Sequence, residues 1–245
     1  MIGIFGGTFD PVHFGHLRSA LEVKDIFGLD EVRLIPCAMP PHRESPAVTA
    51  AMRLQMLALA IKNQPGLTID TRELDRYQLQ QTPSYMVDTL ESLRQEFSNE
   101  TLLLFIGTDA FEHLTGWHQW QQLFDYAHIV VLTRPGFAIQ PLIAKDGVYA
   151  ASPPGAGAAI AKDGVYAASP PGAGAADDFF KLRLAGDITE LAQATAGKLY
   201  FQQITQLDIS ATAIRNIIAQ KQNPGFLLPD AVIEYIKQHQ LYGTH

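Results

Sequence analysis

The stretch GIFGGTFDPVHFGH, Gly3 to His16, decides the fold, because it leads from an apolar strand through a glycine turn into a helix. Ile2–Phe5 is a short apolar run typical of a buried strand, and His16–Phe27, ended by Gly28, has the pattern of a helix. Glycines directly after a strand let the backbone approach a ligand, and successive amides can form an anion-binding nest. The positive end of the helix points at the same place. The stretch therefore predicts a phosphate-binding turn at the start of an α/β fold.

Two histidines occupy the beginning of the predicted helix. His13 and His16 are three residues apart, so both imidazoles fall on one side of the first turn and can reach one ligand. Gly15, between them, leaves room for a nucleotide to lie against the backbone. Histidine pairs with this spacing also cap or solvate helix ends. Their position directly after a strand and a glycine turn favours a binding role.

Apolar runs alternate with amphipathic segments along most of the chain. Runs that are apolar throughout indicate strands buried on both faces of a sheet. The alternation predicts an α/β protein with a doubly wound parallel sheet and helices on both faces, a three-layer α/β/α architecture. After the first strand and helix, the expected strands are Val32–Ile35, Leu67–Ile69, Leu102–Ile106, His128–Leu132 and Leu199–Ile204, and the expected helices are Ala50–Ile61, Ser84–Phe97, Ala211–Ala219 and Pro229–Gln238.

The composition of the 245 residues is that of a globular protein, with 47% hydrophobic and 18% charged residues, and we expect a single domain over residues 1–245. The net charge of −7 argues against binding nucleic acid or an anionic membrane through the overall field, so a phosphate site must be local. A single cysteine, Cys37, excludes an internal disulfide framework and fits a cytoplasmic setting. No signal peptide or apolar run long enough to span a bilayer is visible, which predicts a soluble protein.

One segment breaks the alternation. The 17 residues from Ile143 to Ala159, IAKDGVYAASPPGAGAA, recur without change from Ile160 to Ala176. Two copies are too few for a solenoid, and the Pro/Gly/Ala-rich half of each copy cannot pack an interior. The segment, at about 143–176, is either a mobile lid or a tandem duplication tolerated in a surface loop. We favour the duplication, because long insertions in surface loops cost little stability.

Two motifs carry a resemblance to a known family. The run GGTFDPVHFGH, Gly6 to His16, resembles the signature of the HxGH nucleotidyltransferases and, in this wording, that of bacterial nicotinate-nucleotide adenylyltransferases. ISATAIR, Ile209 to Arg215, is similar to the segment that closes the triphosphate site in that family. Ser210 is placed as a helix N-cap, and the fork of Arg215 suits phosphate oxygens, although each also occurs as a plain cap or a solvated charge. The resemblance implies a Rossmann-like fold, catalytic roles for His13, His16 and Arg215, and ATP contacts at Gly6, Gly7, Thr8, Phe9, His13, His16, Gly107, Asp109, Ile209, Ser210 and Arg215.

Other segments resemble the part of the family that binds the mononucleotide. TPSYMVDT, Thr82 to Thr89, is similar to the family's PSYTxxT stretch, whose backbone amides read the nicotinate carboxylate, and Met86 replaces the usual threonine. FIGTDA, Phe105 to Ala110, resembles the family's IGxDxL stretch. Asp109 is placed there for ribose hydroxyls or as an N-cap. Trp117 matches the tryptophan that stacks on the pyridine ring, while Trp120 is the better core candidate. The mononucleotide contacts implied are Arg43, Ser84, Tyr85, Met86, Asp109, Trp117 and Arg134.

The resemblance covers residues 1–137 and 198–242 and implies adenylyl transfer from ATP to nicotinate mononucleotide, giving deamido-NAD and pyrophosphate in NAD biosynthesis. We expect Mg²⁺ to be held mainly by ATP oxygens and water, because no carboxylate cluster with ligand spacing is visible, and we assign no protein ligand to the metal. Three alternatives remain. They are another member of the superfamily, such as a phosphopantetheine adenylyltransferase or a glycerol-phosphate cytidylyltransferase; the same reaction on nicotinamide mononucleotide; and a non-enzymatic adenine-nucleotide sensor.

Overall fold

The central sheet of the computed structural model, which describes residues 1–39, 45–133, 178–205 and 207–243, has six parallel strands in this part of the chain. Their order is β3-β2-β1-β4-β5-β6, so the chain winds outward from the central β1 to one edge and then returns to β4 on the other side of β1. This reversal makes the β1/β4 boundary the topological switch point, where ligands of open α/β sheets bind. The strands are β1 (Ile2–Gly7), β2 (Glu31–Pro36), β3 (Leu67–Ile69), β4 (Leu102–Gly107), β5 (His128–Thr133) and β6 (Leu199–Gln203).

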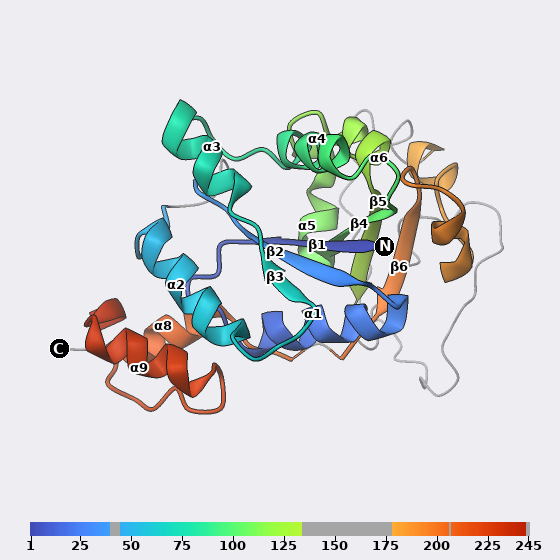
Figure 1. Cartoon of the computed structure of the whole chain (residues 1–245). Coiled ribbons are helices and arrows are strands. Elements are labelled where there is room, and N and C mark those ends of the chain that lie inside the picture. The colour runs from blue at the N-terminus through green and yellow to red at the C-terminus, as the bar shows by residue number, and fades with distance from the viewer. Residues whose placement is uncertain (40–44, 134–177, 206, 244–245) are drawn as a thin grey trace, which may run out of the picture.

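Helices cover both faces of this sheet, which confirms the predicted three-layer architecture (Figure 1). Side chains alternate along each strand, as the pleat requires. In β4, Leu103 and Phe105 belong to the core beneath α1, α2, α8 and α9, while Leu104 belongs to the core beneath α4, α5 and α6. The helices are α1 (Phe14–Phe27), α2 (Ala50–Ile61), α3 (Arg72–Gln80), α4 (Met86–Glu96), α5 (Thr108–Glu112), α6 (Leu123–Tyr126), α8 (Ala211–Ala219) and α9 (Asp230–Gln238).

Every strand and helix predicted from the sequence is present; β3, α2 and α8 have the predicted ends, and the others are shifted by one or two residues. The first helix begins at Phe14 rather than His16, and α4 begins at Met86 rather than Ser84. Gly28 ends α1 in the left-handed conformation, with φ 57° and ψ 44°, where a residue with a Cβ is disfavoured. None of the described helices combines the length and apolar character needed to cross a membrane.

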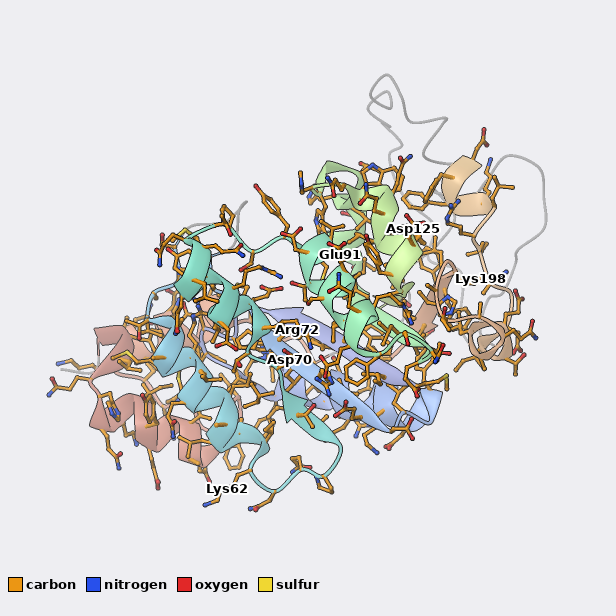
Figure 2. The ribbon with its side chains drawn as sticks, turned by 45° about the horizontal axis from the view of Figure 1, so that its top comes forward. Lys62, Asp70, Arg72, Glu91, Asp125 and Lys198 are labelled. Atoms are coloured by element: carbon orange, nitrogen blue, oxygen red, sulfur yellow. The ribbon has the colours of Figure 1, made fainter. Side chains whose placement is uncertain are left out.

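The sequence analysis missed the polar helix α3 and the short helices α5 and α6. The nine residues of α3 are mostly polar, and Leu74 is the one apolar residue among the two that are buried, so no apolar run indicates a helix here. An ion pair fixes its start: Arg72 donates to the Asp70 carboxylate at 2.7 Å, and the two side chains lie together where β3 leads into α3 (Figure 2). Short 3-10 helices lie at Leu114–Gly116, Trp120–Gln122, Ile188–Gln193 and Leu241–Gly243. The repeated segment lies outside the described residues.

Candidate active site

The turn between β1 and α1 is built around a buried phenylalanine. Phe9 has a left-handed backbone, with φ 51°, and a side chain that is 1% exposed. A Cβ on Gly7 would lie 2.9 Å from the Phe9 ring, so glycine is required for the turn to close over this ring. Gly7 is level with Pro36 in the parallel register, which places the turn at the carboxyl end of the sheet. The turn thus lies between the first strand and the first helix, as predicted, and phosphate binding there stays a prediction.

The two motif histidines face one another at the beginning of α1. His13 is the N-cap residue, His16 lies in the first turn, and their rings stack with centroids 3.7 Å apart and an interplanar angle of 25°. Burial lowers the pKa of His13 to about 4, and burial together with the neighbouring His13 lowers the pKa of His16 well below its usual value. Both imidazoles are therefore neutral at pH 7 in the free protein. Each has a buried Nδ1 without a hydrogen-bond partner among the described residues.

Gly15 makes room for His13. A Cβ on Gly15 would lie 2.9 Å from His13 Nδ1 and 3.0 Å from His13 Cε1. The expectation that this space serves a nucleotide is thus revised, because the ring of His13 already fills it. The same Cβ would lie 3.4 Å from the carbonyl oxygen of Ile209, which brings the second motif next to the first.

The ISATAIR motif enters α8 beside the histidine turn. Ser210 is the N-cap residue of α8, as predicted, and its Oγ accepts from the Ala213 amide at 3.1 Å. Arg215 donates from Nη1 to the carbonyl oxygen of Asp10 at 2.7 Å and from Nη2 to Thr212 Oγ1 at 3.2 Å. A guanidinium has five N–H groups, so three remain for a ligand. Neither α1 nor α8 has an acidic side chain in its first turn, and the positive ends of both helices lack an internal counter-charge there.

The PSYM turn leads into α4 on the other side of β1. Ser84 Oγ accepts from the Ala38 amide at 3.3 Å, which ties the turn to the segment after β2. Tyr85 is the N-cap residue but makes no side-chain capping bond, and its ring lies 4.5 Å, centroid to centroid, from that of His118. Met86 directs its Cε toward Gly6, where an added Cβ would lie 2.8 Å away. The first backbone hydrogen bond of α4 runs from the amide of Thr89 to the carbonyl oxygen of Tyr85. The amides before Thr89, at the start of the helix, are therefore available to an anion.

Comparisons with known proteins identify the family of the chain. A family model described as cytidylyltransferase-like matches residues 4–217. A "Probable nicotinate-nucleotide adenylyltransferase" of Methylococcus capsulatus is 42% identical over 244 residues, which cover 99% of this chain and 100% of that relative. A protein of the same description from Pseudomonas putida is 42% identical over 242 residues, covering 98% and 94% respectively. The chain belongs to the nicotinate-nucleotide adenylyltransferase family.

Solved structures show the same fold at low sequence identity. The nicotinic acid mononucleotide adenylyltransferase of Plasmodium falciparum, complexed with NaAD, matches this adenylyltransferase with a TM-score of 0.65 and 15% identity, covering 100% of this chain and 98% of that one. A putative nicotinate-nucleotide adenylyltransferase of Vibrio parahaemolyticus matches with a TM-score of 0.57 and 13% identity, covering 100% and 96%.

The remaining site predictions for this adenylyltransferase have mixed outcomes. Asp109 follows β4 in the first turn of α5 and is exposed, but Gly107 is the N-cap residue, so the N-cap interpretation of Asp109 is wrong. Trp117 is partly buried next to His118, and Trp120 packs against two phenylalanines near residue 180, with ring centroids 4.9 and 5.2 Å away. Arg43 and Arg134 lie outside the described residues.

Sequence analysis missed Arg53, which lies 1% exposed beneath the site. Its guanidinium donates to the carbonyl oxygen of Thr8 at 2.7 Å and to that of Ala38 at 3.2 Å. Arg53 thus connects the turn after β1 to the segment after β2. Its position was a usable signal, because it precedes the buried residues Met56 and Leu57 by three and four positions and so lies on the core face of α2.

Proposed function

We propose that this chain transfers the adenylyl group of ATP to nicotinate mononucleotide, giving deamido-NAD and pyrophosphate. One observation carries the proposal: the stacked pair His13 and His16 meets the entry to α8, which carries Arg215, at the switch point of the sheet. Two helix N-termini and a guanidinium then surround one position, which suits a triphosphate. Family membership supports the same reaction.

The reaction needs alignment rather than a general base. The phosphate of the mononucleotide is already anionic at neutral pH, and one of its oxygens attacks the α-phosphorus of ATP. The bond from the α-phosphorus to the α–β bridging oxygen breaks, and pyrophosphate leaves with that oxygen. Neutral His13 and His16 can donate N–H groups to phosphate oxygens, and Arg215 offsets the negative charge that develops. Mg²⁺ is proposed to enter with ATP, held mainly by ATP oxygens and water.

The start of α4 is the proposed subsite for the acceptor's carboxylate. Its first-turn amides are not capped by the Tyr85 side chain, and the helix end favours an anion over the neutral amide of nicotinamide mononucleotide. Tyr85 and Trp117 come from segments that meet here through His118, so they supply aromatic faces for a pyridine ring. Arg43 and Arg134 remain proposed contacts to the mononucleotide phosphate.

We also propose that residues 1–245 form a single nucleotidyltransferase domain, since the two motifs lie next to each other beside one sheet. A cytoplasmic setting is proposed on the single cysteine of the sequence.

Pyrophosphate release tests the proposal. The purified chain is incubated with ATP and Mg²⁺, with either nicotinate or nicotinamide mononucleotide, and kcat/KM is measured for each acceptor. We expect release that depends on the acceptor, with nicotinate mononucleotide strongly preferred. A preference for the amide would overturn the nicotinate assignment, and ATP binding without any pyrophosphate would favour a nucleotide sensor.

A further inference from the structure

We propose that Tyr242, which follows α9, is a positioning residue that holds Arg215 and the histidine turn in place through Asp10. The inference rests on the proposed adenylyl transfer, and it adds a residue that the motifs do not contain. Tyr242 donates its hydroxyl to Asp10 Oδ1 at 2.6 Å, across 232 positions of sequence.

Asp10 is the residue at which separate segments meet. Its carboxylate accepts from the Tyr242 hydroxyl on one oxygen and from the Ala47 amide, at 2.6 Å, on the other. Its carbonyl oxygen accepts from Arg215 Nη1 at 2.7 Å. Asp10 is 4% exposed, so these bonds are made away from water, and each stabilises the position of the others. The residue lies three positions before His13, in the same turn.

Tyr242 is also held in place by contacts other than its bond to Asp10. Leu241 is buried in the core beneath α1, α8 and α9, and Tyr242, which has a left-handed backbone with φ 58°, is partly buried and packs against the same core. Burial and the bond to Asp10 raise the pKa of Tyr242, so its hydroxyl stays protonated and keeps its role as a donor. A hydroxyl that is buried, protonated and bonded to a carboxylate restrains that carboxylate firmly.

This arrangement predicts which kinetic constant changes. Without the hydroxyl, one oxygen of a buried carboxylate loses its donor, and Asp10 moves to find another. Its carbonyl then no longer holds Arg215 where charge develops on the α-phosphorus, so kcat falls. The bonds described for Ser84, Tyr85 and Met86 do not involve Asp10, so KM for the mononucleotide stays near that of the wild type.

Tyr242→Phe tests the proposal, because it removes one oxygen and keeps the ring. The matched control is Tyr235→Phe: Tyr235 lies on α9, stacks on His239 at 4.0 Å, and makes no side-chain hydrogen bond among the described residues. We expect Tyr242→Phe to lower kcat about tenfold, the effect of one well-placed hydrogen bond, and Tyr235→Phe to keep the wild-type kcat. Asp10→Asn and the double variant complete a cycle, in which Tyr242→Phe should add little once Asp10 is changed.

Two results would overturn the inference: a wild-type kcat in Tyr242→Phe, whether or not its Tm is lower, or independent effects of the two substitutions in the cycle. If Tyr242→Phe does not fold, Asp10→Asn alone tests the inference. A lower kcat with an unchanged KM for the mononucleotide would support it, and any other result would overturn it. Absence of pyrophosphate release by the wild-type chain would instead contradict the proposed function, so the two failures are distinguishable.

Discussion

The imidazole rings of His13 and His16 stack with their centroids 3.7 Å apart, and neither Nδ1 has a hydrogen-bond partner among the described residues. Two rings in such contact cannot both carry a charge at low cost, and burial lowers the pKa of each. Both imidazoles are therefore neutral in the free protein, and the negative charge of bound phosphates would favour their protonated form.

The first prediction concerns stability against pH. The pKa of His13 is about 4 in the folded protein and near 6.5 in the unfolded chain, so between these values the unfolded chain binds more protons. The free energy of unfolding should thus be fully retained above pH 6.5 and fall as the pH drops toward 4, with His13 contributing up to about 3 kcal/mol. Guanidinium unfolding of the wild type and of His13→Gln at several pH values in this range measures this free energy. An equally steep fall in His13→Gln would contradict the assignment.

The second prediction concerns His16. His16→Ala should keep the fold, judged by circular dichroism, and reduce kcat by roughly 10²- to 10⁴-fold, because a donor aimed at the developing charge is lost. His113→Ala is the control, since His113 is an exposed histidine at the end of α5. Turnover near the wild-type rate in His16→Ala would remove the catalytic assignment.

The third prediction uses the space beside Gly15. In Gly15→Ala the new Cβ would lie 2.9 Å from His13 Nδ1, so the His13 ring must move out of its stack with His16. We expect at least a tenfold loss of kcat, about 1.4 kcal/mol in the barrier. Gly116→Ala is the matched control, because nothing lies within 4 Å of its added Cβ. Equal activity of the two variants would show that the position of His13 is unimportant.

The fourth prediction separates the backbone of Met86 from its side chain. Met86 is the first residue of α4, where proline is well tolerated, and Tyr85 before it has an extended backbone that proline allows. Met86→Thr keeps the amide N–H, whereas Met86→Pro removes it. We expect KM for nicotinate mononucleotide to change less than about threefold in Met86→Thr and to rise tenfold or more in Met86→Pro, the cost of losing a hydrogen bond to a charged group. The opposite order would assign recognition to the side chain.

The fifth prediction concerns the repeat. Deletion of residues 160–176 leaves one intact copy of the segment. If the second copy is a tolerated duplication, Tm and kcat should match those of the full chain, because surface insertions of this length cost little. A clear loss of kcat at unchanged Tm would instead support a lid.

Much of the fold and of the nucleotide side of the site could be predicted from the sequence. The apolar runs at Leu102–Ile106 and His128–Leu132 indicate strands covered on both faces, and the glycines at the end of β1 indicate a tight turn. Signals of this kind act within a few residues of one another. The polar helix α3 was not predicted because it lacks such a local signal. Few of its residues are buried, and an ion pair between Arg72 and Asp70 holds its start.

By itself, then, the sequence determined the strand–turn–helix order, the pairing of His13 with His16, and the family. Only the tertiary structure decided that Gly15 makes room for His13, that buried Arg53 joins two loops, and that Tyr242 bonds to Asp10. The physical reason is that these relationships depend on close approach and on hydrogen bonds between segments as far as 232 residues apart. Local propensity carries no information about which distant group will reach a buried carboxylate or carbonyl; the packing of helices on the sheet supplies it.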